Sequence, residues 1–144
     1  FFYNEAILNS RGNVVNKRYK DRIIKVYDHS YNASPYSLKK QIIHFDNLKV
    51  TKKLCIIGSI KELGNQTDKY HRALLEDLKD LKVKRIILIG EDFFKLRSSY
   101  KTYNFYKSYK NYINVMKKDL EYGKNIFVMG SRLNNLDKVI QNIC

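Results

Sequence analysis

The fold follows from a short segment in the middle of the chain, Arg85-Ile86-Ile87-Leu88-Ile89-Gly90. An apolar run that ends in glycine is typical of a strand that is covered on both faces. Three further segments are predicted as strands, namely residues 23–27, 54–60 and 126–128. Each predicted strand is followed by apolar residues at helical spacing. We therefore predict an α/β fold, a three-layer Rossmann-like domain with a mostly parallel sheet flanked by helices.

The predicted helices have recognisable starts and apolar faces. Ser34-Pro35 predicts a helix start, because a serine oxygen caps free backbone N–H groups and proline suits the first helical position. Thr67 is the predicted cap of the second helix. Residues 95–110 have the least regular pattern and are predicted to form an exposed connection. The helical faces are defined by Leu38, Ile42 and Phe45; by Tyr70, Leu74, Leu78 and Leu81; by Ile113, Met116 and Leu120; and by Leu136, Val139, Ile140 and Ile143.

Length and composition favour one globular domain. The chain has 144 residues, of which 44% are hydrophobic and 29% charged, and a domain of this size can bury a core without staples. We therefore expect residues 1–144 to be a single domain, with residues 1–21 leading into it. No apolar run is long enough to cross a bilayer and no export signal is visible, so we expect no membrane association.

The cysteines point to a reducing compartment. Cys55 and Cys144 are too few for a disulfide framework or a cysteine-based zinc site, and Cys55 is predicted to be a buried apolar residue. We expect a cytoplasmic protein with no metal site of its own, since no paired Cys and His spacing occurs. The chain begins with Phe1 rather than Met, which indicates a piece of a longer polypeptide.

The formal net charge of +14 has two interpretations. Clustered Lys and Arg suit a polyanion partner, and residues 100–118 interleave Tyr with Lys in a pattern that could stack bases and neutralise phosphates. The chain is also rich in residues that AT-rich codons encode. We favour this compositional bias over nucleic-acid binding. The interleaved residues are Tyr103, Tyr106, Lys107, Tyr109, Lys110 and Tyr112.

Polar residues follow the predicted strands at the edge where ligands bind in such folds. Asp28 directly follows the first predicted strand, and an Asp at that position can accept hydrogen bonds from ribose hydroxyls. Residues 27–35 can equally be a polar turn that leads into a helix cap. The sequence alone leaves both interpretations open.

Four blocks together carry a resemblance. Residues 27–35 match D-x-S-Y-N-A-N-P, residues 56–64 with His71 match V-L-G-D-M-x-E-L-G and a later His, residues 123–132 match G-D-x-V-L-V-K-G-S-R, and residues 11–14 match G-R-G-x-V. In this order and spacing they resemble the carboxy-terminal domain of the Mur ligase family, in its D-alanyl-D-alanine-adding branch (MurF). The resemblance covers residues 11–132. The chain departs from the pattern at Ser10, Ser34, Ser59, Lys124 and Met129.

The resemblance implies an ATP-dependent amide ligase of three domains, of which this is the third. In the complete enzyme, ATP phosphorylates the terminal carboxylate of UDP-MurNAc-tripeptide, and the amine of D-alanyl-D-alanine attacks the acyl phosphate. The product is a peptidoglycan precursor, which links the enzyme to cell shape and cell division. This chain has no G-x-x-x-x-G-K-[ST] loop. We therefore expect the isolated domain to be inactive, with ATP and Mg²⁺ held mainly by the central domain.

The resemblance also implies partners and roles for single residues. The partners are the protein's own amino-terminal and central domains, UDP-MurNAc-tripeptide and D-Ala-D-Ala; we expect a monomer that binds no nucleic acid. Arg11 matches an arginine that reaches the ATP phosphates, and Asp28 matches an aspartate that accepts from the ribose. Tyr31, Asn32, Ser34 and Pro35 complete the nucleotide-binding signature, with Asn32 near the adenine. No catalytic residue is expected in this domain.

Two residues near the end of the pattern are candidates for substrate binding. Ser131 and Arg132 follow a predicted strand, and a guanidinium suits the carboxylate of the incoming dipeptide. Met129 replaces a lysine of the pattern, which either removes a cation that faces substrate or fills a core position. Glu62, Gly64 and His71 are predicted to shape a loop and cap a helix.

Two alternative functions remain. The first is another Mur-type amide ligase, such as the diaminopimelate-adding enzyme, which the Tyr31-Asn32-Ala33 form and the lack of a D-N-P-R block disfavour. The second is a basic nucleic-acid-binding α/β module, which the charge and residues 100–118 would serve.

Overall fold

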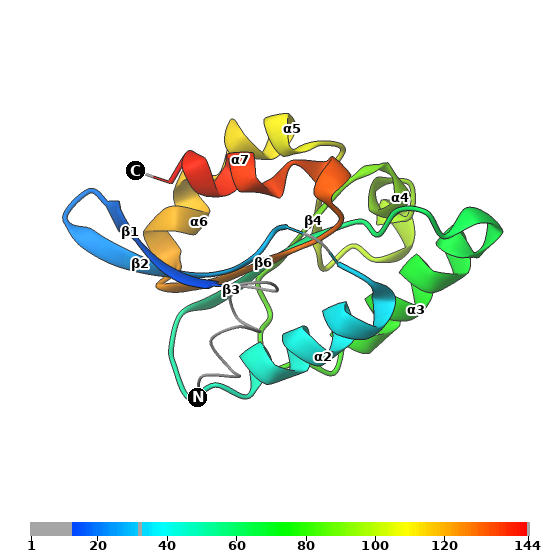
Figure 1. The fold of residues 1–144 in the computed structure, drawn as a ribbon, viewed down its shortest axis with the longest axis horizontal. Helices are drawn as coiled ribbons and strands as arrows, with labels where there is room; N and C mark the ends of the chain where they lie inside the picture. Colours follow the sequence, from blue (N-terminus) through cyan, green and yellow to red (C-terminus); the bar gives the residue numbers. More distant parts are fainter. Residues whose placement is uncertain (1–12, 32, 144) are drawn as a thin grey trace.

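A computed structural model describes residues 13–31 and 33–143. Within these residues one six-stranded sheet lies between two layers of helices (Figure 1). The strand order is β1-β2-β6-β3-β4-β5, and all neighbours are parallel except β1 and β2. The predicted fold class is confirmed. The strands are β1 (Asn13–Tyr19), β2 (Arg22–His29), β3 (Lys53–Gly58), β4 (Ile86–Ile89), β5 (Asn104–Tyr106) and β6 (Asn125–Met129).

The helices divide between the two faces of the sheet. The side of α2, α3 and α4 holds one buried cluster, and the side of α5, α6 and α7 holds the other. Short 3-10 turns η1, η2 and η3 join some of these elements. The helices are α2 (Pro35–Asp46), α3 (Thr67–Leu78), α4 (Glu91–Phe94), α5 (Tyr109–Ile113), α6 (Lys117–Tyr122) and α7 (Leu136–Gln141), and the turns are η1 (Gly64–Gln66), η2 (Arg97–Ser99) and η3 (Arg132–Asn134).

The central strands are apolar apart from their first residues, Lys53 in β3 and Asn125 in β6, because both of their faces are buried. In β3, Leu54 and Ile56 pack on the α5–α7 side, whereas Cys55 and Ile57 pack on the α2–α4 side. This alternation follows from the two-residue period of a strand. Full burial of a side chain of this kind contributes about 1.5–3 kcal/mol to stability. The prediction that Cys55 is a buried apolar residue is confirmed, and burial raises the pKa of its thiol.

The chain winds first along one face of the sheet and then back along the other. Helices α2, α3 and α4 follow β2, β3 and β4 on one side, and α5 and α6 then lead across the opposite side to β6, which lies between β2 and β3 (Figure 1). Consequently the segments that leave the neighbouring strands β2 and β6 turn to opposite faces, toward α2 and α7. Such a divergence is the topological switch point at which open α/β sheets bind ligands.

The strands at the two sides of the sheet were not predicted. β1 forms a hairpin with β2, and β5 pairs with β4 within residues 95–110. The prediction that residues 95–110 are an exposed connection is therefore wrong. Leu96, Tyr100 and Tyr103 of this segment are buried in the core, and three residues of strand are too few to give a pattern in the sequence.

The tyrosines that suggested base stacking belong largely to the core. The Tyr112 hydroxyl donates to Asp119 Oδ2 at 2.8 Å, and the Tyr103 hydroxyl donates to the Leu75 carbonyl at 3.0 Å. Both side chains are buried, and Tyr112 is fully so. A base cannot stack on these two rings, so that part of the nucleic-acid interpretation is wrong.

Two helix predictions also change. Thr67 is the first residue of α3, and Gln66 occupies the cap position without a side-chain bond, so Thr67 is not the cap. The single helix expected around Met116 is two helices, α5 and α6, with Met116 between them. The start of α2 is as predicted, with Ser34 as cap and Pro35 in the first turn. No helix in the described part of the chain is long and apolar enough to span a membrane.

Candidate functional site

The loops after β2 and β6 bring the predicted site residues to one edge of the sheet. These two strands are parallel neighbours, so their carboxyl ends lie side by side. Asp28 is the penultimate residue of β2, Tyr31, Ser34 and Pro35 come after that strand, and Ser131 and Arg132 follow β6. The structure thus gathers residues from the two halves of the chain at the switch point.

Asp28 fixes the first of these loops. Its Oδ1 accepts hydrogen bonds from the Ser30 backbone N–H at 2.9 Å and from the Ser30 hydroxyl at 2.6 Å. Ser30 is buried, and Asp28 is half-buried. A carboxylate that bonds the backbone two residues later forms an Asx turn. One role of Asp28 is therefore to set the path of the chain between β2 and α2.

Ser34 and Pro35 start α2. The Ser34 hydroxyl accepts from the Ser37 backbone N–H at 3.2 Å, and the Ser34 backbone N–H donates to the Ser37 hydroxyl at 3.0 Å. This reciprocal arrangement is a capping box. Serine at a position where the family pattern has asparagine keeps the cap.

Tyr31 and Arg132 meet across the switch point. The Arg132 guanidinium lies 4.5 Å from the centre of the Tyr31 ring, which is the distance of a cation–π contact. Both side chains are exposed, with 63% of Tyr31 accessible. The contact joins the loop after β2 to the loop after β6, and it presents a cation and an aromatic ring to whatever approaches this edge.

Ser131 is part of the frame beneath this pair. It is buried, and its hydroxyl accepts a hydrogen bond from the Lys61 backbone N–H at 2.8 Å. The Lys61 ammonium lies 3.3 Å from Asp92 Oδ2, which ties the loop after β3 to the start of α4. Ser131 therefore holds the loops after β3 and β6 together, and Arg132 is the exposed member of the predicted substrate pair.

Asn134 links the segments that follow β3 and β6 at this edge of the sheet. Its amide donates to the carbonyls of Ser59 and Ser131 at 2.6 and 3.1 Å, and its oxygen accepts from the Ser59 hydroxyl at 3.1 Å. All three residues are buried. Sequence reasoning missed Asn134, because an asparagine after a strand has no pattern that separates it from an ordinary turn residue.

Glycines let the strand ends approach closely at the same place. A Cβ on Gly130 would lie 2.6 Å from the Cα of Gly58, and a Cβ on Gly90 would lie 2.4 Å from the Ser59 hydroxyl oxygen. Gly90 also has a φ of +125°, which residues with a side chain avoid. The carboxyl edge is therefore a tightly packed floor, above which Tyr31 and Arg132 stand.

The comparison with protein families decides the family of the chain. Residues 10–132 match the model of the Mur ligase glutamate ligase domain. The chain belongs to this family. The four sequence blocks all lie within the matched residues.

Curated relatives and solved structures agree with this assignment. The chain is 31% identical over 122 residues to a UDP-N-acetylmuramoyl-tripeptide–D-alanyl-D-alanine ligase of Borreliella burgdorferi, and this match covers 80% of the chain and 26% of the relative. It is 28% identical to the ligase of the same name from Rickettsia prowazekii, over 94% of the chain and 30% of that protein. The chain thus spans less than a third of the length of these relatives.

Two solved structures have the same fold. MurF from Acinetobacter baumannii superposes with a TM-score of 0.74 at 18% identity, over 91% of this chain and 29% of that one. MurF ligase from Thermotoga maritima in complex with ADP superposes with a TM-score of 0.71 at 22% identity, over 92% and 30%. These similarities establish the arrangement of the sheet and its helices.

His71 shapes the loop after β3 in the Mur ligase domain. Its Nδ1 donates to the Thr67 carbonyl at 2.6 Å, and its Nε2 accepts from the Ile60 backbone N–H at 3.0 Å. These bonds define the neutral tautomer of the ring. Burial lowers the pKa of His71, which favours the same neutral form. Glu62 and Gly64 have φ of 65° and 58° in this loop, so the predicted loop-shaping role is confirmed. The predicted capping role is wrong, because neither η1 nor α3 has a side-chain cap bond.

Met129 lies in the core of the domain. Its side chain is 2% exposed, in the cluster on the α2–α4 side of the sheet. Of the two interpretations of this departure, the structure supports a core replacement, because a side chain buried there does not face a substrate. Ser59, another departure, is buried in the bonds with Asn134.

Two predicted nucleotide contacts, Arg11 and Asn32, lie outside the described residues. The relationship between Arg11 and Asp28 on which the nucleotide prediction rests is therefore untested. Residues 13–31 and 33–143 contain no group of three or more His, Cys, Asp or Glu side chains that could hold a metal ion.

Proposed function

We propose that this domain is the closing domain of an ATP-dependent ligase that adds D-alanyl-D-alanine to UDP-N-acetylmuramoyl-tripeptide in peptidoglycan precursor synthesis. The observation that carries the proposal is the similarity over 80% and 94% of the chain to two ligases with that name. The domain has no phosphate-binding loop of the G-x-x-x-x-G-K-[ST] type. It is therefore inactive alone and acts when it meets the other domains of the same polypeptide.

The carboxyl edge has the properties that closure requires. Close approach at Gly58 and Gly130 and the hydrogen bonds of Asn134 pack it tightly, and a tightly packed support keeps contacts within the small tolerance that catalysis needs. In the closed enzyme, this edge covers the reacting groups and excludes water, which would otherwise hydrolyse an activated carboxylate. Arg132 then offers two parallel hydrogen bonds to the carboxylate of the incoming dipeptide.

The nucleotide side of the proposal uses the loop after β2. ATP supplies the phosphoryl group that activates the carboxylate. Tyr31 and the Asp28 turn suit the outer side of a nucleotide, since an exposed ring can lie against a base and Asp28 can accept from a ribose hydroxyl. Arg11 and Asn32 complete this set in the proposal.

The remaining features of the proposal concern the whole protein. It works as a monomer in the cytoplasm, and its product serves cell-wall growth and through it cell shape and division. Mg²⁺ is held mainly by the domains that carry the phosphate-binding loop, because the described residues of this domain offer no cluster of metal ligands.

The test is a ligase assay with the full-length protein. Release of ADP and phosphate is measured with UDP-MurNAc-tripeptide, ATP, Mg²⁺ and D-alanyl-D-alanine, and the 144-residue chain is assayed in parallel. We expect turnover by the full-length protein and none by the chain alone. A second assay supplies UDP-MurNAc-dipeptide and diaminopimelate. Turnover there, with none in the first assay, would assign the protein to the diaminopimelate-adding ligases.

A further inference from the structure

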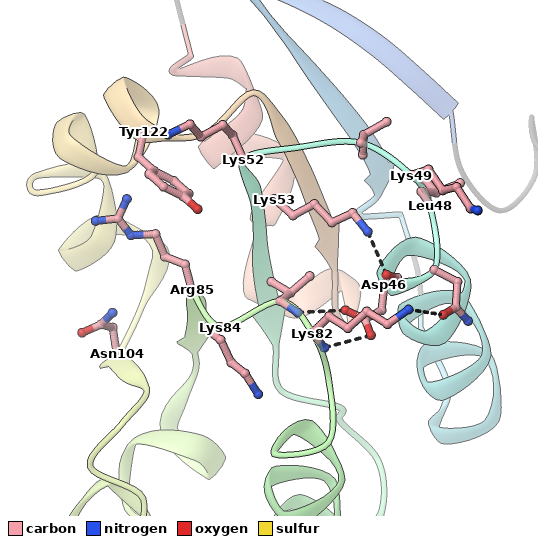
Figure 2. A pocket seen from close by; sticks show the side chains of 13 residues that line it. Asp46, Leu48, Lys49, Lys52, Lys53, Lys82, Lys84, Arg85, Asn104 and Tyr122 are labelled. Carbon is pink, nitrogen blue, oxygen red and sulfur yellow. Dashed lines mark hydrogen bonds between the residues drawn. The ribbon is translucent and has the colours of Figure 1, made fainter.

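A basic hollow lies at the amino edge of the sheet, opposite the candidate site. Its volume is about 730 Å³, within the range of roughly 300–1,000 Å³ that is usual for ligand pockets. It is formed where β3, β4 and β5 begin and by the loop between α2 and β3 (Figure 2). Six cationic side chains line it: Lys49, Lys52, Lys53, Lys82, Lys84 and Arg85.

The one carboxylate in this lining forms no ion pair with the cations. Asp46 Oδ1 accepts from the Val83 backbone N–H at 2.9 Å, and Asp46 Oδ2 accepts from the Lys82 backbone N–H at 3.0 Å. Asp46 is buried. Its carboxylate oxygens are therefore bonded to the backbone of the loop before β4, and this clamp fixes the segment from which the side chains of Lys82 and Lys84 project (Figure 2).

Most contacts of these lysines are with neutral oxygens. The Lys53 ammonium donates to the Asp46 carbonyl at 2.7 Å, and the Lys84 ammonium donates to the Leu81 carbonyl at 2.7 Å. Lys82 donates to the amide oxygen of Asn47 at 3.4 Å. Neutral acceptors orient an ammonium group without cancelling its charge. The field in the hollow therefore stays strongly positive.

Tyr122 supports two more cations. The Arg85 guanidinium lies 4.2 Å and the Lys52 ammonium 5.1 Å from the centre of its ring. Arg85 Nε also lies 3.5 Å from Asp119 Oδ1, the one carboxylate among the described residues within ion-pair distance of the six cations. Figure 2 shows the Tyr122 ring between Lys52 and Arg85. With both cations against it, the ring is not a free platform for a base.

We propose that this hollow binds a small ligand with several phosphate groups, such as inorganic tripolyphosphate or the phosphate chain of a nucleotide. Six cations around one hollow, of which Arg85 alone has an ion pair among the described residues, suit closely spaced phosphates, and the Asp46 clamp fixes the backbone of the loop that carries Lys82 and Lys84. Binding of a single-stranded RNA would call for exposed aromatic rings for its bases. The aromatic residue of this lining is already occupied by cations, so the observations favour a compact oligophosphate.

This site is independent of the proposed ligase function. It lies at the amino edge of the sheet, whereas Tyr31 and Arg132 lie at the carboxyl edge. The two proposals can therefore be tested independently: a negative result for phosphate binding leaves the ligase proposal standing, and a negative result for ligation leaves the phosphate site standing.

The test is a calorimetric titration of the 144-residue chain with inorganic tripolyphosphate in the absence of Mg²⁺, at about 50 and about 200 mM salt. The variant Lys49→Gln/Lys84→Gln removes two cations of the hollow. The matched variant Lys69→Gln/Lys138→Gln removes two exposed cations from α3 and α7. We expect the first variant to weaken binding roughly tenfold and the second to bind within about twofold of the parent.

Three results would overturn the proposal. Equal weakening by both double variants would show attraction to net charge rather than to a site. Loss of binding in Arg132→Ala would place the phosphate at the carboxyl edge. A mixed-sequence RNA that binds where tripolyphosphate does not would identify a nucleic-acid surface. Thermal unfolding of each variant, with unchanged Tm, verifies that a loss of binding is not a loss of fold.

Discussion

The guanidinium of Arg132 lies 4.5 Å from the centre of the Tyr31 ring, across the point where the loops after β2 and β6 diverge. A cation held against a ring loses less conformational freedom when it binds an anion than a free side chain does. If Arg132 binds the dipeptide carboxylate, as we propose, the Tyr31 ring would position the guanidinium for that contact.

Substitution of Arg132 is expected to impair ligation without unfolding the domain. In the full-length protein, Arg132→Ala should lower kcat/KM for D-alanyl-D-alanine roughly 10- to 100-fold, because a charge-assisted pair is lost. The Tm should stay unchanged, since the side chain is exposed. Steady-state kinetics and thermal unfolding measure the two quantities. Leu133→Ala, at a neighbouring residue that is 69% exposed, is the control, and an equal loss there would contradict the role of Arg132.

Addition of one methyl group at Gly130 is expected to disrupt the carboxyl edge. The new Cβ would lie 2.6 Å from the Cα of Gly58, and backbone cannot move aside as a flexible side chain can. Gly130→Ala should lower the free energy of unfolding, measured by urea denaturation, by an amount toward the upper end of the range of about 1–3 kcal/mol that overpacking costs. Gly64→Ala is the comparison, because Gly64 has a φ of +58° but no atom within 4 Å of the added Cβ. It should cost about 1 kcal/mol from strain alone. Equal costs would refute the steric explanation.

The middle of the sheet could be predicted from the sequence, and its sides could not. Residues 54–57 and 86–89 are apolar because helices cover both faces of β3 and β4, and this burial leaves a direct pattern. β1 has exposed residues along most of its length, with Tyr19 as its buried residue. β5 is three residues long, and its pairing with β4 depends on a contact that the local sequence does not encode.

The same distinction separates the parts of the candidate site. The Ser34 cap could be predicted because the bonds of a helix start are local. Tyr31 and Arg132 were both predicted as site residues, but their contact requires β6 to lie beside β2, which follows from the order of strands in space. Asn134 was missed for the same reason, since the carbonyl of Ser59 that it binds belongs to another strand end.

Tyr112 is expected to stabilise the domain through its buried hydroxyl. Tyr112→Phe removes the bond to Asp119 Oδ2 and leaves a buried carboxylate with one partner fewer. The free energy of unfolding should fall by about 1.5–3 kcal/mol in urea denaturation, as for other hydrogen bonds to charged groups. Tyr36→Phe, at a residue that is 76% exposed, should have no measurable effect. Unchanged stability of the Tyr112 variant would mean that water replaces the lost donor.

His71 is expected to make the domain less stable in mild acid. Burial lowers the pKa of the folded ring below the ordinary 6.5, so the unfolded chain takes up a proton at a pH at which the folded chain does not. The free energy of unfolding contributed by this residue is therefore complete above about pH 6.5 and decreases as the pH falls below that value.

Urea denaturation at several pH values between 7.5 and 5 measures this slope, and His71→Gln should flatten it. His44→Gln, at an exposed histidine, should keep the slope of the parent protein. A His71→Gln variant with the full slope would show that other groups cause the loss of stability in acid. The hydrogen bonds of His71 with Ile60 and Thr67 would then position its ring without making the stability of the domain depend on the protonation of that ring.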